Sequence, residues 1–160
     1  MVRVRTDIID AYIFRRSARR VEMLQLRRTT SPLQGTWQPV MGHARRGESA
    51  VKCLWRELRE ETGLTRRSAG FVRAWALSQV HPYYLADLDA IVISPCFAVE
   101  VSRGWAPRLN AEHDDARWVE ARRPERSFMW PGQILAVREL VGSLGRGLLN
   151  TQAIAIRTIG

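Results

Sequence analysis

Three glutamates stand close together in the middle of the chain, at positions 57, 60 and 61. Carboxylate oxygens are the ligands that Mg²⁺ prefers in proteins, and it takes a few of them together with water and substrate phosphate. A carboxylate beside such a cation can also accept a proton from an attacking water. The spacing of Glu57, Glu60 and Glu61 is therefore compatible with hydrolysis of a phosphate compound. The alternative is an acidic surface patch that pairs with arginines elsewhere.

The glutamates are expected on a helix over residues 49–61. Ser49 or Glu48 can cap its start, and Gly63 follows where a helix usually ends. On this helix the glutamates fall within an arc of about 100°, beside the apolar stripe. Like charges at these spacings cost a few tenths of a kcal/mol each, so a cation is expected to compensate them. The stripe is formed by Val51, Leu54, Trp55 and Leu58.

The rest of the chain alternates irregularly between strand and helix patterns. Apolar runs predict strands over 8–14, 21–28, 36–42, 70–80, 90–101 and 116–120, with loops over 29–35 and 81–89. An amphipathic pattern predicts a second helix over 131–145, and the apolar-rich tail after Gly147 fits either a packed extension or a frayed end. A mixed sheet covered by helices is the expected α/β (α+β) architecture.

Composition narrows the class of protein. We expect the 160 residues, with 46% hydrophobic side chains, to form one domain over 1–160. No run approaches the roughly 20 apolar residues that span a bilayer, and no secretory signal opens the chain. Cys53 and Cys96 form no disulfide framework, so we expect reduced thiols and a cytoplasmic protein. The net charge of +9 comes almost wholly from arginine, since Lys52 is the one lysine, and this suits phosphate-bearing partners or a solvated basic surface.

A longer pattern surrounds the glutamates. The stretch "GHARRGESAVKCLWRELREETGL" (42–64) matches G-x5-E-x7-R-E-U-x-E-E-x-G-U at every specified position, where U is aliphatic. At average residue usage, a chance match is well below about one in a million. The stretch resembles the Nudix box. This resemblance implies a mixed sheet in an α/β/α sandwich, and hydrolysis of a phosphoanhydride in a nucleoside diphosphate derivative with Mg²⁺ or Mn²⁺.

The resemblance also assigns residues by position. Glu57, Glu60 and Glu61 would bind the metal, as would the backbone carbonyl of Gly42, and Arg56 would pair with the glutamates and hold their rotamers. Glu57 and Glu60 count with Arg56 among the catalytic residues, and the family leaves open which glutamate is the base. Glu48 would support the loop or reach a metal through water.

Other side chains are candidates outside the box. Glu112, beside His113, resembles an acidic residue that enters the site in relatives that hydrolyse dATP or dihydroneopterin triphosphate; the alternative is an ordinary acidic turn. The pair Trp37-Gln38 is similar to a "WQ" of the same relatives, where the ring would stack on a base or pterin or else anchor the strand. Further candidates are Arg27 or Arg28 as a phosphate clamp and Tyr83 and Tyr84 as a base pocket, whereas His81 is expected in a loop without a metal-ligand partner.

These observations favour a metal-dependent hydrolase of nucleoside or pterin triphosphates that releases pyrophosphate and the monophosphate. A second enzymatic hypothesis is hydrolysis of a dinucleoside polyphosphate or an RNA 5′ end, which the arginines would suit. A third is a basic nucleic-acid-binding module without turnover, although the intact box argues against it. Small polyphosphates are thus favoured as partners over nucleic acid, no membrane is expected, and a homodimer is one state that the resemblance allows.

Overall fold

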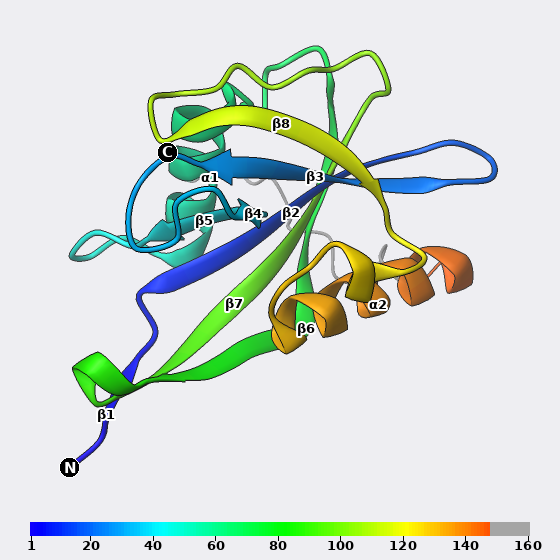
Figure 1. The fold of residues 1–160 in the computed structure, drawn as a ribbon. Coiled ribbons are helices and arrows are strands. Elements are labelled where there is room, and N and C mark those ends of the chain that lie inside the picture. The colour runs from blue at the N-terminus through cyan, green and yellow to red at the C-terminus, as the bar shows by residue number, and fades with distance from the viewer. Residues whose placement is uncertain (148–160) are drawn as a thin grey trace.

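One eight-stranded mixed sheet forms the middle layer of the molecule (Figure 1). The structure is a computed structural model that describes residues 1–147, so the predicted tail beyond Gly147 lies outside the described residues. Strand β7 pairs in parallel with β1 and β2, and the remaining pairs are antiparallel. The strands are β1 (Arg3–Arg5), β2 (Ile8–Arg16), β3 (Val21–Arg28), β4 (Trp37–Gln38), β5 (Val40–His43), β6 (Phe71–Leu85), β7 (Ala90–Val101) and β8 (His113–Glu120).

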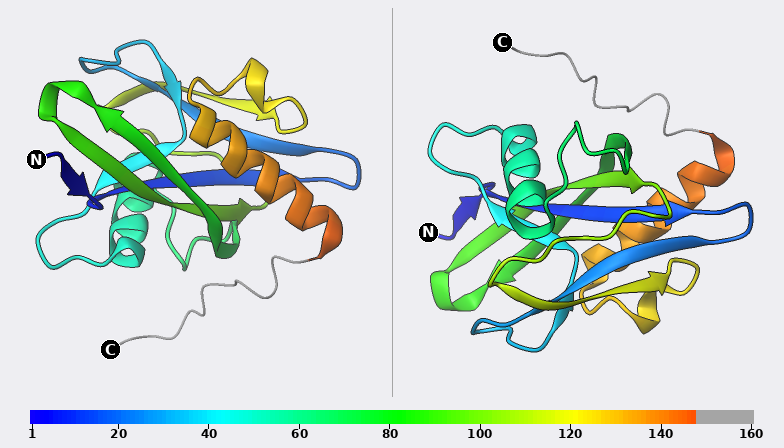
Figure 2. Two further views of the ribbon diagram at one scale, coloured as in Figure 1. Left: turned by 90° about the horizontal axis from the view of Figure 1, so that it is seen from below. Right: turned by 90° about the horizontal axis from the view of Figure 1, so that it is seen from above.

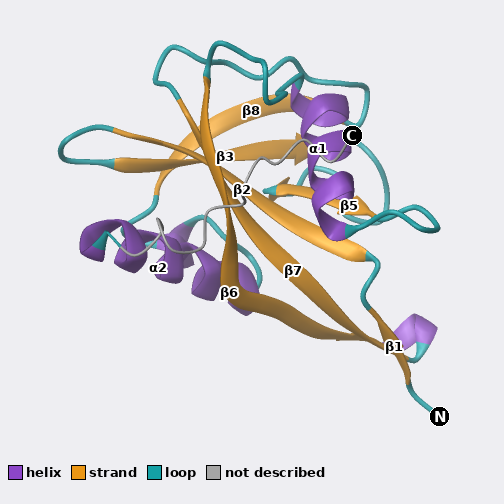
Figure 3. Ribbon diagram, turned by 180° about the vertical axis from the view of Figure 1, so that it is seen from behind, coloured by secondary structure: helices purple, strands orange, loops and turns teal. Residues whose placement is uncertain are grey.

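Two helices cover opposite faces of this sheet, as Figures 2 and 3 show. They are α1 (Ala50–Thr62) and α2 (Pro131–Arg146), and two short 3-10 turns, η1 (Ala86–Leu88) and η2 (Pro124–Arg126), complete the elements. The predicted α/β/α sandwich is confirmed. Within residues 1–147, neither helix combines the length and apolar character needed to cross a membrane.

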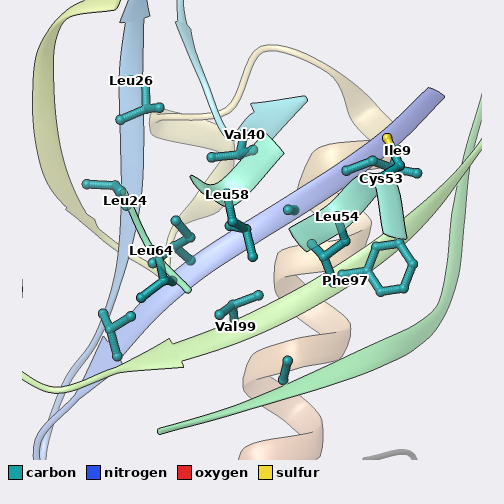
Figure 4. Packing of buried hydrophobic residues seen from close by; sticks show 14 residues of the cluster. Ile9, Leu24, Leu26, Val40, Cys53, Leu54, Leu58, Leu64, Phe97 and Val99 are labelled. Atoms are coloured by element: carbon teal, nitrogen blue, oxygen red, sulfur yellow. The ribbon is translucent and has the colours of Figure 1, made fainter. Parts of the chain in front are cut away.

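Alternating side chains of the strands supply one core on each face of the sheet. On β2, Ile9 and Ile13 pack beneath α1, whereas Tyr12 and Phe14 pack beneath α2. Figure 4 shows Leu54 and Leu58 of α1 lying over β2 in the first of these cores. Both leucines are fully buried, so the apolar stripe predicted for this helix faces the sheet.

The sheet opens where β2 and β3 diverge. Strand β3 pairs with β2 at Met23↔Phe14 but with β4 at Leu26↔Gln38, while β5 pairs with β2. The prediction of a single strand over 36–42 is therefore wrong. The segment forms two strands, β4 and β5, which are separated at Pro39 and pair with β3 and β2 respectively. This division places Gly42 of β5 next to α1.

The loop predicted over 81–89 is wrong for most of its length. Strand β6 continues to Leu85 and forms a long hairpin with β7, pairing Tyr83↔Val92 and Leu85↔Ala90. Because β6 pairs only with β7 among the described strands, it is an edge strand, and an edge strand tolerates Pro82. The turn residues that suggested a loop belong instead to the hairpin end at η1.

His81 is likewise not the loop residue that its sequence context suggested. It is 4% exposed, and its Nδ1 lies 2.9 Å from Oδ2 of Asp10, which is fully buried. The Ser94 hydroxyl donates to Oδ1 of Asp10 at 3.3 Å. On its other side, the imidazole packs against Gly132 in the first turn of α2, so this buried polar cluster joins α2 to the sheet.

Gly132→Ala should lower the free energy of unfolding by about 1–3 kcal/mol, because the added methyl would lie 2.0 Å from His81 Cδ2. Gly145→Ala in the same helix is the matched control, since its methyl would meet no atom within 4 Å. Urea unfolding of both variants measures the difference. Equal stabilities would show that His81 does not constrain this end of α2.

Candidate active site

The glutamate-bearing helix α1 begins and ends at the residues that the sequence indicates. The hydroxyl of Ser49 accepts a hydrogen bond from the Lys52 backbone N–H at 3.3 Å, which caps the start. Gly63 adopts a left-handed φ of 71° and its N–H donates to Arg59, which closes the end. The predicted span 49–61 is confirmed to within one residue at each end.

The guanidinium of Arg56 donates hydrogen bonds to three carboxylates and one backbone carbonyl. Its side chain, 10% exposed, donates to Glu48 at 2.9 and 3.0 Å, to Glu57 at 2.6 Å and to Glu60 at 3.1 Å. It also donates to the carbonyl of His43 at 2.8 Å. These contacts lower the pKa of Glu48 to about 2, chiefly through the hydrogen bond from Arg56. The geometry therefore agrees with the pairing expected of Arg56.

The loop before α1 is tied to the same centre. An oxygen of Glu48 accepts a hydrogen bond from the backbone N–H of Arg45 at 2.9 Å, and the guanidinium of Arg45 lies 3.5 Å from Glu60. Glu48 thus supports the loop, as one of its two expected roles requires. Sequence reasoning did not single out Arg45, and only its place within the matched stretch could have suggested it.

Gly42 lies directly beneath Glu57. A Cβ at this position would come within 2.1 to 2.3 Å of the terminal atoms of the Glu57 side chain, so only glycine leaves room for that carboxylate against β5. Burial raises the pKa of Glu57, while Arg56 acts in the opposite direction. The strand β5 and the helix α1 therefore form a cradle for one carboxylate.

Glu61 is the most unusual acidic residue of the site. It is 3% exposed, and its Oε2 has no hydrogen-bond partner among the described residues. Nε2 of His113 lies 4.0 Å from Oε2 of Glu61, and burial lowers the pKa of that imidazole, which favours its neutral form. Burial, followed by the charges of Glu57 and Glu112, raises the pKa of Glu61 to about 9. A buried carboxylate oxygen without a partner calls for a cation or a proton.

Glu112, in the segment before β8, adds a further carboxylate whose charge acts on Glu57 and Glu61. The carbonyl of Glu112 accepts a hydrogen bond from the Thr29 N–H at 2.9 Å, which fixes the backbone beside the end of β3. The Glu112 charge raises the pKa of both Glu57 and Glu61. The structure thus groups Glu112 with the box, although the two lie far apart in sequence.

Of the two candidate phosphate clamps, Arg28 is the one whose charge acts on Glu61, where it lowers the pKa. Arg27 instead forms an ion pair with Asp114 at 2.8 Å, and its guanidinium lies 5.8 Å from the centre of the Trp37 ring. Sequence reasoning treated Arg27 and Arg28 as equivalent, since nothing in their spacing separates them.

The cation contacts of Trp37 and the side-chain hydrogen bond of Gln38 are with residues other than the glutamates of α1. Arg117 covers the Trp37 ring at 4.2 Å, so a base that stacked on this face would have to displace that guanidinium. Gln38 is buried and its amide donates to the Thr36 hydroxyl at 3.0 Å. Tyr83 and Tyr84 belong to the β6–β7 hairpin, where Tyr84 donates to Asp89.

The residues present fit a divalent cation in three respects. Glu61 has a buried oxygen without a partner, Gly42 leaves space for Glu57, and Glu112 adds further negative charge beside both. In the described part of the chain, however, no three Asp, Glu, His or Cys side chains converge closely enough to hold a metal ion as they stand. Arg56 holds Glu57 and Glu60, so both side chains would have to turn toward Glu61 to share an ion.

Arg56→Ala should lower the free energy of unfolding by about 3 kcal/mol, because it leaves Glu48 and Glu57 without their shared, largely buried cation. Arg59→Ala on the same helix is the control. Arg59 is 62% exposed and reaches only Glu60, at 3.7 Å, so its loss should cost less than about 1 kcal/mol. Chemical denaturation measures both, and a cost for Arg56 no larger than that for Arg59 would contradict this account of the site.

One curated relative matches part of the chain. An octanoyltransferase of Myxococcus xanthus is 36% identical over 88 residues, which make up 54% of this chain and 23% of that protein. The match therefore takes in less than a quarter of the relative's length.

Several solved structures share the fold over nearly the whole described chain. A NUDIX hydrolase of Listeria monocytogenes has a TM-score of 0.71 at 21% identity and covers 91% of this chain and 98% of its own. An Ap4A hydrolase of C. elegans has a TM-score of 0.71 at 18% identity, with 88% and 98% covered. The dihydroneopterin triphosphate pyrophosphohydrolase of E. coli has a TM-score of 0.70 at 16% identity, with 87% and 99% covered.

The family assignment rests on sequence. The model of the NUDIX domain matches residues 4–140, which include the sheet, α1 with its glutamates, and most of α2. The chain belongs to the NUDIX domain family.

Proposed function

We propose that this protein hydrolyses a phosphoanhydride in a nucleoside or pterin triphosphate and releases pyrophosphate and the monophosphate. The observation that carries the proposal is the buried, unpartnered oxygen of Glu61 beside Glu57 and Glu112. Such a concentration of negative charge is costly unless a cation joins it. Members of the family generally use divalent metals, and the fold neighbours described as pyrophosphohydrolase and Ap4A hydrolase support the reaction class.

Glu57, Glu60 and Glu61 would hold Mg²⁺ or Mn²⁺, together with the backbone carbonyl of Gly42. The ion would neutralise phosphate oxygens and make a bound water more acidic. Arg56 orients Glu57 and Glu60 from behind and is a positioning residue in this scheme.

Glu112 is the proposed proton acceptor. In this role its carboxylate takes a proton from the attacking water, whose oxygen forms the new bond to phosphorus while the anhydride P–O bond breaks. Arg28, whose charge acts on Glu61, would hold an oxygen of the departing pyrophosphate or monophosphate. This choice replaces Arg27, which Asp114 engages.

Two classes of polyphosphate are candidate substrates. The Trp37 ring supports a base or pterin substrate only if Arg117 moves from its face. A dinucleoside polyphosphate is the second candidate, supported by the fold shared with an Ap4A hydrolase and by the arginine surplus. Identifying the released products from dATP, dihydroneopterin triphosphate and diadenosine tetraphosphate distinguishes them.

Octanoyl transfer finds less support in the described residues. A cysteine that accepted the octanoyl group would have to ionise and be accessible to the donor. Cys53 and Cys96 are both buried. Burial raises the pKa of Cys53 to about 11 and raises that of Cys96 as well. Both thiols are free, which suits the reducing cytoplasm in which we place the protein.

Glu61→Gln should lower turnover of the best substrate at least about a hundredfold, because even the outer partners of metal ligands often cost ten- to a hundredfold. The fold should be retained, since glutamine has the shape of the neutral carboxyl that burial favours. Glu120→Gln is the control, because this exposed residue lies at the far end of β8. Steady-state kinetics with Mg²⁺ and thermal melting measure both effects, and wild-type turnover in Glu61→Gln would overturn the proposed metal site.

Glu112→Gln should lower kcat by at least about tenfold while leaving KM and the melting temperature near those of the wild type. The amide cannot accept the proton from water, yet Glu112 is exposed and its backbone contact to Thr29 is retained. Asp114→Asn, two residues further on, is the matched control, since Asp114 faces Arg27. An unchanged kcat would remove Glu112 from the mechanism.

A further inference from the structure

A basic pocket lies on the flank of α1 that faces away from Glu57 and Glu61. It is a pocket of about 470 Å³ whose lining carries five cationic side chains and no carboxylate. At 100° per residue, Lys52 and Arg59 lie roughly 140 to 160° around the helix from Glu57. The lining consists of Lys52, Trp55, Arg56, Arg59, Thr65, Arg66 and Arg67.

The cations of this pocket are poorly neutralised by the protein itself. Within residues 1–147, no carboxylate lies within ion-pair distance of Lys52, Arg66 or Arg67. Arg59 reaches only Glu60, at 3.7 Å. Glu57 and Glu61 lie on the opposite flank of α1, and Glu60 is held mainly by Arg56, so the charges of Lys52, Arg66 and Arg67 have no acidic partner among the described residues.

An aromatic ring lies within this charged lining. The guanidinium of Arg66 lies 4.8 Å from the centre of the Trp55 ring, and Phe71 supports the ring edge-on at 5.4 Å. The indole N–H of Trp55 is buried and has no acceptor among the described residues. Cations beside an aromatic ring are features with which proteins hold single-stranded nucleic acid. As at Trp37, a base that stacked on the covered face of Trp55 would have to displace the guanidinium there, so the cations would first bind the phosphates.

The geometry points to a binding site for single-stranded nucleic acid on this flank of α1. Charge complementarity selects the occupant, because a phosphodiester chain presents one negative charge per nucleotide to Lys52, Arg66 and Arg67, which no carboxylate of the described residues neutralises. Arg56 lines the pocket and also binds Glu57, so the site adjoins the glutamates from behind. The inference rests on this pocket and is independent of the proposed hydrolysis.

Binding should be tested on the full chain with a fluorescent single-stranded RNA of about 12 nucleotides. Its 5′ end should be a hydroxyl and the buffer should contain a chelator, so that the proposed hydrolytic site takes no part. If four phosphates are contacted, the Kd should rise roughly fiftyfold between about 50 and 200 mM salt. No binding at the lower salt concentration would overturn the inference.

The double variant R66E/R67E should weaken binding at least about tenfold and reduce the salt dependence. The matched control is R122E/R123E, which makes the same change of charge beside another arginine-lined pocket, near η2, that also contains Glu120. The control should bind RNA within about threefold of the wild type if the α1 flank is the site. Equal losses in the two double variants would mean that net charge alone attracts the RNA, and would overturn the inference.

Two further arms make the outcome specific. A glutamate oligomer with the same number of charges should bind at least about tenfold more weakly than the RNA, and equal binding would overturn the assignment to nucleic acid. Glu61→Gln should bind RNA as the wild type does, whatever its effect on hydrolysis, because Glu61 lies on the other flank. Loss of RNA binding in a folded Glu61→Gln protein would contradict the separation of the two sites.

Discussion

Burial of Leu54 and Leu58 against the sheet sets the rotation of α1 about its own axis, and the rest of the site depends on that rotation. Once these leucines face β2, the positions of all other side chains on the helix follow from its 100° repeat. Glu61 is carried to the edge of the core and becomes buried, Glu57 meets Gly42, and Glu60 remains half-exposed. Two fully buried leucines contribute roughly 3–6 kcal/mol, and this contribution favours the rotation that brings the acidic side chains together.

That cost is distributed unevenly among the carboxylates. Glu48, Glu57 and Glu60 share one guanidinium, so Arg56 neutralises the outer part of the cluster. Glu61 has no such partner within residues 1–147, and burial together with its acidic neighbours raises its pKa to about 9. A site with one unsatisfied acid among satisfied ones favours a cation at that single place. The positive charge of the remaining surface meanwhile suits a polyanionic substrate.

The same helix separates two kinds of charge. One flank carries the acidic side chains and the other carries Lys52 and Arg59, with Arg56 between them. On an ordinary surface helix, acids and bases alternate and pair across one turn. Here Arg56 pairs with Glu57 and Glu60, but Glu61 on one flank and Lys52 on the other have no partner of opposite charge among the described residues. The metal proposed for one side and the phosphodiester chain proposed for the other both correspond to this segregation.

The sequence by itself determined the helix α1, its caps and the grouping of Glu57, Glu60 and Glu61, because these depend on local periodicity and fixed spacing. It also indicated most strands and the sandwich. Only the tertiary structure decided that the charge of Arg28 acts on Glu61 while Arg27 pairs with Asp114, that Arg117 covers Trp37, and that His81 is buried against Asp10. Each of these joins segments far apart in the chain, and such contacts depend on strand pairing and packing, which no local pattern of residue types records.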